Sequence, residues 1–525
     1  MIDAPPPEQP SALPADATVA ARPRRAPVRA RAPGQVTPKR AGVSTISIGI
    51  FLAGVFMVLV HLFFGRDDFD FVARALAAVP LFPLLWELNR AVNRPPGPQL
   101  PFAATALLIN YLTFSFASLF NTQFKDLSGP VTFTNDARIM GAAAIALSSL
   151  SIYAGMRLGE GLGRVLQPRL LRLYPPAQVP AKFSTAIAIY ALACAGITQI
   201  VSTSGIPAAI GVLIAMTLSF AYVIGAAAAS PDRFRGRWSR YVVTATVTFG
   251  VVAGVLTGGM ENLFRLTTTV ITVRWVHFRR FSVVGVVALL MVYTILQPAK
   301  AKFRAQIWVQ HGSQEAPTYV DRIEAWRVSI EDLWSSRDAA QTSGDAAVGR
   351  FLELDPILHA FTLIPGRVPF AEGAAWKNIL YAPIPRLFWP DKPTTSDLTR
   401  DYGIAFNLQD AVGVRSTSIL LSLVVDGYWN FGWPGIVFAS VLSGLWVGVC
   451  QTMYAGDHWA LQAAGTAQFA LIYIIGSFAL LYAGIVQLIC GGIFAAWLVH
   501  WLATFLSPRE ARQRRLVGAP RTIKL

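Results

Sequence analysis

Long apolar runs recur along most of the chain and are separated by short polar stretches. A helix needs about 20 apolar residues to cross the ~30 Å hydrocarbon core of a bilayer, so these runs predict transmembrane helices. The eighth run is short and carries Arg265, and the last two runs are divided at Tyr482 to Gly484. The twelve predicted spans are 43–64, 70–88, 101–120, 139–158, 183–203, 206–229, 240–258, 261–276, 281–297, 433–453, 464–482 and 484–505.

The predicted spans fall into two blocks, 43–297 and 418–506, flanked by polar tails. Residues 1–42 are rich in Pro, Ala and Arg and contain almost no large apolar side chain, so we expect a disordered basic tail. No apolar segment with a small-residue cleavage site follows its basic region, so we expect no signal peptide. A second basic tail covers 507–525.

Basic residues between the spans predict the orientation of the chain. With the N-terminus inside, the loops 89–100, 159–182, 230–240 and 274–280 are cytoplasmic, and each is rich in arginine. The short loops on the other side carry no such excess. The sequence therefore predicts a multi-pass protein with both termini in the cytoplasm.

One polar stretch, residues 298–417, is far longer than the others and lies on the extracytoplasmic side by the same alternation. Within it, in "YVDRIEAWRVSIEDLW", Ile323, Trp326, Ile330 and Trp334 recur at helical spacing. This pattern predicts an amphipathic helix lying on the helix bundle or on the lipid interface.

Composition agrees with a membrane protein. The 525 residues are 54% hydrophobic and 14% charged, whereas a soluble domain carries about 25% charged residues. The net charge of +16 would suggest nucleic acid in a soluble protein, but here the basic residues lie between and outside the apolar runs, so orientation explains them better. The three cysteines have neither paired nor metal-ligand spacing, so neither a disulfide framework nor a zinc site is expected.

The long loop concentrates the charges from which chemistry is expected. It contains no Gly-rich phosphate loop, no HExxH, no GxSxG and no paired D-x-D carboxylates, so we expect neither a metal nor a cofactor. A reaction outside the cell must receive its energy with the substrate, as a lipid-linked pyrophosphate does. Arginine binds phosphate oxygens in bidentate fashion, and the loop carries nine arginines: Arg304, Arg322, Arg327, Arg337, Arg350, Arg367, Arg386, Arg400 and Arg415.

Two stretches carry a family resemblance: "VPFAEGAAWKNILYAPIPRLFWPDKP" and, after it, "DGYWNFGWPGIVFASVLSGLWVG". They resemble the Wzy-type O-antigen and exopolysaccharide repeat-unit polymerases, which show a P-R-x-x-W-P-x-K-P stretch in the large outer loop and N-F-G-x-x-G at the next span. Many of those proteins carry a glutamate where this chain has Asp426. Arg265 occupies the place of an arginine that the family carries near the outer end of an earlier span. The matching positions are Gly373, Pro385, Arg386, Trp389, Pro390, Lys392, Pro393, Asn430, Phe431, Gly432 and Gly435.

The resemblance implies a fold like that of the membrane glycosyltransferases that use polyprenyl-linked donors. It also implies the reaction, which is en bloc transfer of a growing glycan from undecaprenyl pyrophosphate to an incoming lipid-linked repeat unit at the outer face of a bacterial inner membrane. A chain-length regulator and a flippase are candidate partners, besides the bilayer and the lipid-linked glycan. An O-antigen ligase and a lipid-linked glycan transporter remain alternatives.

Ten residues are candidates for the site. The catalytic candidates are Arg386, Asp391, Glu372 and His359, and those for substrate binding are Arg265, Arg367, Lys392, Arg415, Trp389 and Asn430. Several have plainer interpretations. Trp389 can anchor the loop at the interface while Arg386 pairs with Asp391, and His359 can be a packed interfacial residue. Arg265 can pair with nearby Glu261 or extend outward, and Asn430 can shape a helix start.

Overall fold

The computed structural model of this chain is mostly helical. The structure describes residues 45–94, 99–120, 124–203, 219–230, 237–256, 258, 260–278, 280–304, 306–307, 318–335, 353–376, 389, 395–410, 421–472 and 478–507. The predicted tails 1–42 and 507–525 therefore lie outside the described residues, apart from Ser507.

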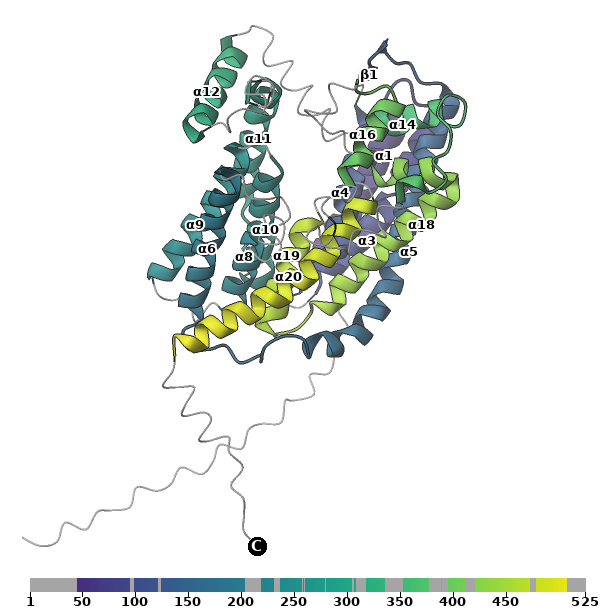
Figure 1. Cartoon of the computed structure of the whole chain (residues 1–525). Helices are drawn as coiled ribbons and strands as arrows, with labels where there is room; N and C mark the ends of the chain where they lie inside the picture. The colour runs from purple at the N-terminus through teal and green to yellow at the C-terminus, as the bar shows by residue number, and fades with distance from the viewer. Residues whose placement is uncertain are drawn as a thin grey trace, which may run out of the picture. The chain divides into compact units, whose positions relative to one another are not determined.

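The first part of the chain forms an antiparallel set of helices (Figure 1). The predicted span 70–88 is divided into two helices near Pro80, whose missing N–H interrupts the helical ladder. A two-stranded ribbon pairs Lys125 with Pro130. The elements are α1 (Thr45–Phe64), α2 (Phe71–Ala78), α3 (Leu81–Val92), α4 (Phe102–Asn110), the π-helix η1 (Tyr111–Ser115), the 3-10 helix η2 (Phe116–Leu119), β1 (Lys125–Asp126), β2 (Gly129–Pro130) and α5 (Asn135–Leu171).

The rest of the chain adds a second set of helices, and the long predicted loop contains helices of its own. These elements are α6 (Phe183–Thr203), α8 (Phe220–Ala229), α9 (Arg237–Leu256), α10 (Met260–Phe278), α11 (Val283–Arg304), α12 (Tyr319–Ser335), α14 (Leu354–Leu363), η5 (Ala374–Trp376), α16 (Thr395–Ala405), α18 (Leu423–Met453), α19 (Trp459–Leu471) and α20 (Phe478–Phe505). We call the end of the bundle that carries α12, α14 and α16 the outer end, and the opposite end the inner end (Figure 1).

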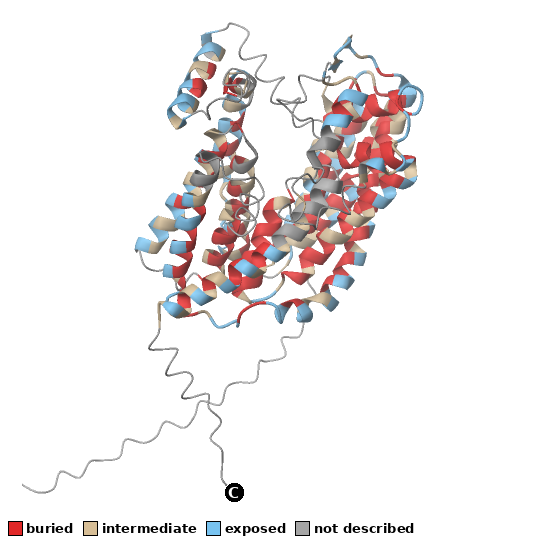
Figure 2. Ribbon diagram, viewed as in Figure 1, coloured by how far each residue is buried: buried red, intermediate tan, exposed pale blue. Residues whose placement is uncertain are grey.

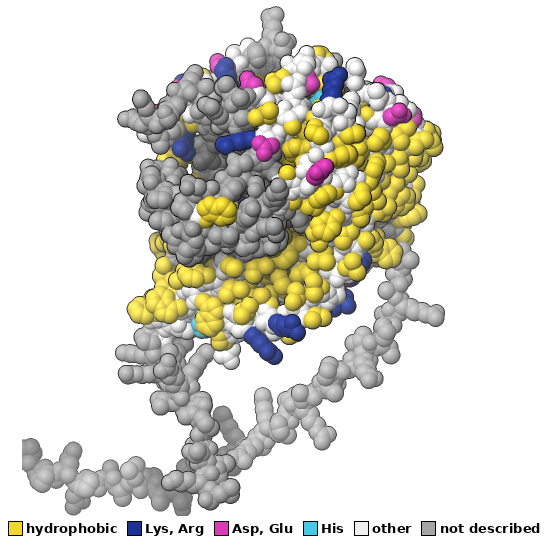
Figure 3. Space-filling view, turned by 45° about the vertical axis from the view of Figure 1, so that its right-hand side comes forward, with side chains coloured by type: hydrophobic (Ala, Val, Ile, Leu, Met, Phe, Trp, Pro, Cys, Tyr) yellow, Lys and Arg dark blue, Asp and Glu magenta, His cyan; other side chains and the backbone are white. Residues whose placement is uncertain are grey.

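Six helical segments among the described residues are long and apolar enough to cross a membrane: Thr45–Phe64, Phe71–Val92, Phe102–Leu119, Asn135–Leu171, Trp238–Leu256 and Leu423–Met453. Hydrophobic side chains cover a broad band on one face of the protein, with Lys and Arg along its lower edge (Figure 3). The other predicted spans overlap shorter or less apolar helices among the described residues, so the count of twelve stays a prediction.

Two predicted boundaries are wrong. α20 runs unbroken through Tyr482 and Gly484, where the last two spans were to be divided, and α19 already ends at Leu471. α5 continues to Leu171 instead of ending near residue 158, because its charged residues find partners on neighbouring helices. The amphipathic helix is confirmed as α12. It packs on the bundle through Trp326, which stacks on Phe303 at 4.5 Å, whereas Ile323 is exposed.

α5 and α18 pack along most of their length on one side of the bundle, at the right in Figure 1. Small residues allow this approach. A Cβ at Gly159 would lie 2.0 Å from the carbonyl oxygen of Leu445, and one at Gly448 would lie 2.1 Å from that of Met156. Backbone therefore touches backbone, which is the packing that small residues permit between membrane helices.

The buried side chains, red in Figure 2, form two main clusters along this pair of helices. The larger one lies among α3, α4, α6, α8, α18, α19 and α20. The second lies among α2, α14, α16 and the first turns of α5 and α18. The second cluster holds the outer-end segments on the bundle, so the part of the predicted loop around α14 and α16 is packed structure.

Candidate functional site

α18 is broken at the motif that the sequence singled out. Phe431 and Gly432 depart from helical geometry, and Gly432 has φ 65° and ψ −146°, a conformation that favours glycine. Pro434 follows and cannot donate to the preceding turn. The two half-helices approach so closely that a Cβ at Gly435 would lie 2.0 Å from the carbonyl oxygen of Gly427. The motif N-F-G-x-x-G therefore builds a sharp bend, in agreement with a structural role for Asn430.

A buried carboxylate lies one turn before the break. Asp426 is fully buried and accepts hydrogen bonds from Nε1 of Trp376 at 3.0 Å and from Nδ2 of Asn430 at 3.0 Å. The amide of Asn430 also donates to the Asp426 carbonyl at 2.8 Å. In addition, the backbone N–H of Ala371 donates to the carbonyl of Trp429 at 2.8 Å. Residues 371–376 are thereby fastened to the first half of α18.

The turn that precedes Trp376 explains why the motif position 373 is a glycine. Glu372 and Gly373 both have positive φ, 47° and 80°, which makes a tight turn ahead of η5. A Cβ at Gly373 would lie 2.6 Å from the ring of Phe431, so a larger residue would be strained in two ways. The side chain of Glu372, a candidate base, is exposed at this turn. The structure therefore brings Glu372 and Asn430 to the same small region.

Aromatic rings surround this bend. Phe361 lies 4.0 Å from Tyr428 between ring centroids, and Trp376 packs edge-on against Phe431 at 5.3 Å. Phe370 and Phe431 remain 38% and 48% exposed, so part of this aromatic surface is open. Exposed ring faces next to polar groups suit a ligand with both apolar and hydroxyl-bearing surfaces.

His359 lies on α14 within the second cluster. It is 2% exposed, its Nε2 is 3.0 Å from the carbonyl of Phe406, and its ring contacts Phe124. Its Nδ1 has no hydrogen-bond partner among the described residues. This environment agrees with the packed interpretation of His359, and its role as a base stays a prediction.

One turn before His359, Asp355 forms a buried ion pair. Nη1 of Arg66 is 2.6 Å from Oδ1 of Asp355, and the two side chains are only 5% and 7% exposed. Arg66 also binds Asp68 at 3.0 Å, and Asp68 binds Arg138 at 3.1 Å. Sequence analysis missed this network. Its only signal was the dense charge in the short loop between α1 and α2.

The carboxyl of Glu353, which precedes α14, has a raised pKa. Its backbone N–H donates to the carbonyl of Thr113 at 2.9 Å, so it is held against the π-helix η1. Burial raises the pKa of the Glu353 carboxyl to about 8. The carboxyl is therefore mostly protonated at neutral pH.

The remaining candidates are placed as follows. Arg265 lies on α10, and its Nε donates to the carbonyl of Ala470 at 3.1 Å, near the end of α19, where carbonyls lack helical partners. Arg367 is exposed and Trp389 is half-buried. Four candidates lie outside the described residues: Arg386, Asp391, Lys392 and Arg415.

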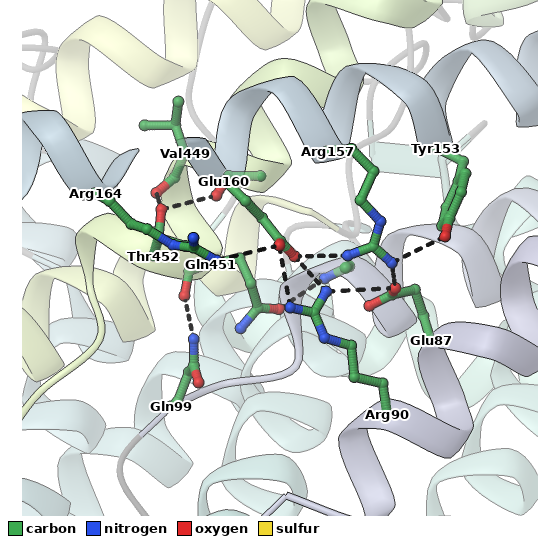
Figure 4. A network of polar contacts seen from close by, with 12 residues as sticks. Glu87, Arg90, Gln99, Tyr153, Arg157, Glu160, Arg164, Val449, Gln451 and Thr452 are labelled. Carbon is green, nitrogen blue, oxygen red and sulfur yellow. Dashed lines mark hydrogen bonds and ion pairs between the residues drawn. The ribbon is translucent and has the colours of Figure 1, made fainter. Parts of the chain in front are cut away.

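A second polar network joins α3 to α5 nearer the inner end (Figure 4). Arg90 donates to both carboxylate oxygens of Glu160, at 2.6 and 3.1 Å. Arg157 donates to Glu160 at 3.1 Å, to the hydroxyl of Tyr153 at 3.1 Å and to Glu87. Sequence analysis assigned Arg90 and its neighbours to cytoplasmic loops. It did not identify the buried carboxylates Glu87 and Glu160, which fall inside one predicted span and just beyond another.

No metal site can be assembled from the described part of the chain, where no group of three His, Cys, Asp or Glu side chains is suitably placed. The site at the outer end is thus a bend in a long helix, with a buried carboxylate, an amide and open aromatic faces.

These features define a helical protein with several helices fit to cross a membrane and a packed polar site beside the break in one of them. Residues 177–501 match the family described as a domain of unknown function (DUF8712), and the chain belongs to that family. The matched segment contains the outer-end site but leaves out α1 to α5. No curated protein and no solved structure matches the chain.

Proposed function

We propose that this protein polymerises oligosaccharide repeat units carried on undecaprenyl pyrophosphate, at the outer face of a bacterial inner membrane. The bond between the anomeric carbon of the growing glycan and its pyrophosphate oxygen breaks. A bond to a hydroxyl of the incoming repeat unit forms, the hydroxyl proton passes to a base, and undecaprenyl pyrophosphate leaves. The donor supplies the energy, so no nucleotide is consumed.

The observation that carries this proposal is the hydrogen bond between Trp376 and Asp426. It joins the two sequence stretches on which the resemblance to repeat-unit polymerases rests, at the outer end of the bundle. Their proximity supports a common site, because the two stretches that carry the resemblance meet around one buried carboxylate.

The chemistry available at this end suits the reaction. Oδ1 of Asn430 is buried and has no hydrogen-bond partner among the described residues, so it is the proposed acceptor for a sugar hydroxyl once the bend opens. The open faces of Phe370 and Phe431 offer packing surface for a sugar ring. Glu372, at the adjacent turn, is the exposed candidate for the base. Arg265, Arg367, Arg386, Lys392 and Arg415 are the proposed cations for the pyrophosphate.

The proposed orientation rests on the charge bias of the predicted loops, which assigns both termini to the cytoplasm. The outer end then faces away from nucleotides, in keeping with a lipid-linked donor. A chain-length regulator and a flippase are the candidate partners at this position.

Purified protein in liposomes, given only lipid-linked repeat units, tests the proposal. We expect a ladder of longer glycans on the lipid without added nucleotide, at a rate that EDTA barely changes. Arg386→Ala and Arg265→Ala should abolish lengthening, and Lys at either position should rescue it only partly because the bidentate geometry is lost. A strict need for a nucleotide sugar or a divalent ion would refute it.

The same system separates the two alternatives. Transfer of finished polymer to a lipid A core acceptor, without lengthening of repeat units, identifies a ligase. Movement of lipid-linked glycan across the liposome membrane, without any new glycosidic bond, identifies a transporter.

A further inference from the structure

A cavity of about 660 Å³ opens beside the inner half of α3 and α5. Three arginines line it, Arg90, Arg94 and Arg157, together with two asparagines, a tryptophan and a tyrosine. It lies on the α1–α5 side of the protein, and none of its residues belongs to the outer-end site described above. Its lining is therefore a separate concentration of hydrogen-bond donors.

Two carboxylates hold two of these arginines, Arg90 and Arg157, from the protein side. Glu87 and Glu160 are only 3% and 8% exposed, whereas Arg90 and Arg157 are 33% and 30% exposed (Figure 4). The guanidinium group of Arg157 also packs over the ring of Tyr153 at 4.7 Å. The acids thus lie beneath the arginines and fix their orientation, while the arginines keep partly open edges toward the cavity. Such fixed donors bind an anion at little cost in conformational entropy.

The charges around the cavity do not cancel. Its three lining arginines face two buried carboxylates, which leaves one positive charge in excess. Arg164, which is 69% exposed and lies 3.9 Å from Glu160, is outside the lining and does not face the cavity. The cavity therefore favours an anion with one negative charge, as a phosphodiester carries.

An apolar groove lies next to this cavity. It has a volume of about 410 Å³, runs between α1 and α3, and is lined mainly by Phe51, Val55, Leu59 and Phe82. Trp86 and Asn89 line both the groove and the cavity, so the two spaces adjoin. Both flanking helices belong to segments fit to cross a membrane, so the groove is placed where acyl chains lie.

We propose that the groove and the cavity together bind one membrane phospholipid with an anionic headgroup. Its phosphate lies among Arg90, Arg94 and Arg157, and an acyl chain lies along α1 and α3. A soluble phosphate compound would use the cavity alone, whereas the adjoining apolar groove favours a ligand with a hydrocarbon chain. This site goes beyond glycosyl transfer and does not rest on it.

Native mass spectrometry of the full-length protein in detergent tests this proposal with two lipids of equal chain length. We expect dioleoyl phosphatidylglycerol to bind about tenfold more tightly than dioleoyl phosphatidylcholine, equivalent to about 1.4 kcal/mol. Arg94→Gln should remove most of that preference. Arg164→Gln, a change of the same type outside the lining, should retain it. Equal binding of the two lipids, or no effect of Arg94→Gln, would overturn the proposal.

Three further variants test whether a loss of lipid binding is specific and not the result of misfolding. A competition experiment tests for a soluble ligand. Asn89→Asp keeps the acceptor that receives the amide of Asn93 but adds a negative charge where groove and cavity meet, so it should also lower phosphatidylglycerol binding. Val55→Trp fills the groove and should weaken the lipid, whereas Val72→Trp, at an exposed apolar position of α2, should not. Competition by inorganic phosphate at the same concentration as the lipid would show a soluble-anion site and overturn the lipid assignment.

Discussion

Nε1 of Trp376 donates a 3.0 Å hydrogen bond to Oδ1 of Asp426, which is 50 positions away in the sequence. Because Asp426 is fully buried, this bond both satisfies a carboxylate and fastens a loop segment to the broken helix α18. The same contact thus determines the local stability of the outer end and the shape of the proposed active site.

Trp376→Phe removes this donor and keeps an aromatic ring. We expect the free energy of unfolding to fall by about 1–3 kcal/mol, because a buried carboxylate loses a hydrogen bond, and lengthening of lipid-linked repeat units to fall with it. Thermal unfolding in detergent measures the first effect. Trp497→Phe is the control, since its N–H donates to the Leu173 carbonyl at an exposed position. Equal losses in both variants would contradict a special role for Trp376.

Backbone packing between α5 and α18 makes a paired prediction. Gly159→Ala should destabilise the protein by about 1–3 kcal/mol, because its methyl group would collide with the Leu445 carbonyl. Gly161→Ala, two residues further along the same helix, meets nothing within 4 Å and should be neutral or stabilising by up to about 1 kcal/mol. Urea or thermal unfolding of the two variants gives the comparison. Similar effects at both positions would contradict the close packing.

Glu353 predicts a pH dependence of stability. Its pKa is about 8 in the folded protein against 4.5 for a free side chain, so the folded state holds the proton over that interval. Stability should therefore fall as pH rises from about 4.5 to about 8 and then level off. Glu353→Gln should flatten this slope in thermal unfolding at a series of pH values.

Glu324→Gln is the matched control for Glu353. A hydrogen bond from Arg327 lowers the pKa of the Glu324 carboxyl, so its contribution is present above the unfolded pKa and is lost only in acid. The slope between pH 5 and pH 8 should be unchanged in this variant. A flattened slope in the control, or none in Glu353→Gln, would remove Glu353 as its cause.

Arg66→Ala should be strongly destabilising, by about 3–5 kcal/mol, because Asp355 would keep a buried negative charge. The double change Arg66→Met with Asp355→Leu should recover most of the loss, since both charges are then gone. Arg327→Ala breaks exposed pairs with Glu324 and Glu331 and should destabilise the protein far less than Arg66→Ala does. A double variant as unstable as Arg66→Ala would contradict the ion-pair explanation.

The proposed orientation can be measured by cysteine labelling in intact cells, in a Cys490→Ser background because Cys490 is exposed. Leu127 and Leu173 are both exposed and lie at opposite ends of the bundle. A membrane-impermeant maleimide should label Leu127→Cys without permeabilisation and Leu173→Cys only after it. The reverse result would place the candidate site in the cytoplasm.

The sequence predicts much of this fold because helix placement depends on local patterns. Apolar runs located α1, α6 and α11 closely, and helical spacing located α12. Boundaries failed where tertiary contacts override the pattern. Gly484 looked like a break, but glycine is common within membrane helices. Glu160 fell in the predicted loop 159–182, but Arg90 on α3 pairs with it and α5 continues.

The side-chain contacts of the candidate site were harder to predict from the sequence. The sequence singled out Gly373 and Gly432 as motif positions, and the structure gives each a positive φ. The pairing of Trp376 with Asp426 depends on how α18 bends, and no local pattern encodes the partner of a buried carboxylate. The same holds for Arg66 with Asp355, which lie on segments 289 residues apart.

The glycine contacts between α5 and α18 also limit how the protein can change shape. A shift of one helix along the other by a single residue, about 1.5 Å, would replace glycine by a side chain at each backbone contact. These two helices therefore behave as one rigid unit and cannot slide along each other. The part of α18 after the Phe431–Gly432 break is locked to α5 by these contacts. A movement of the first half of α18 that opens the outer end therefore requires rotation at this break.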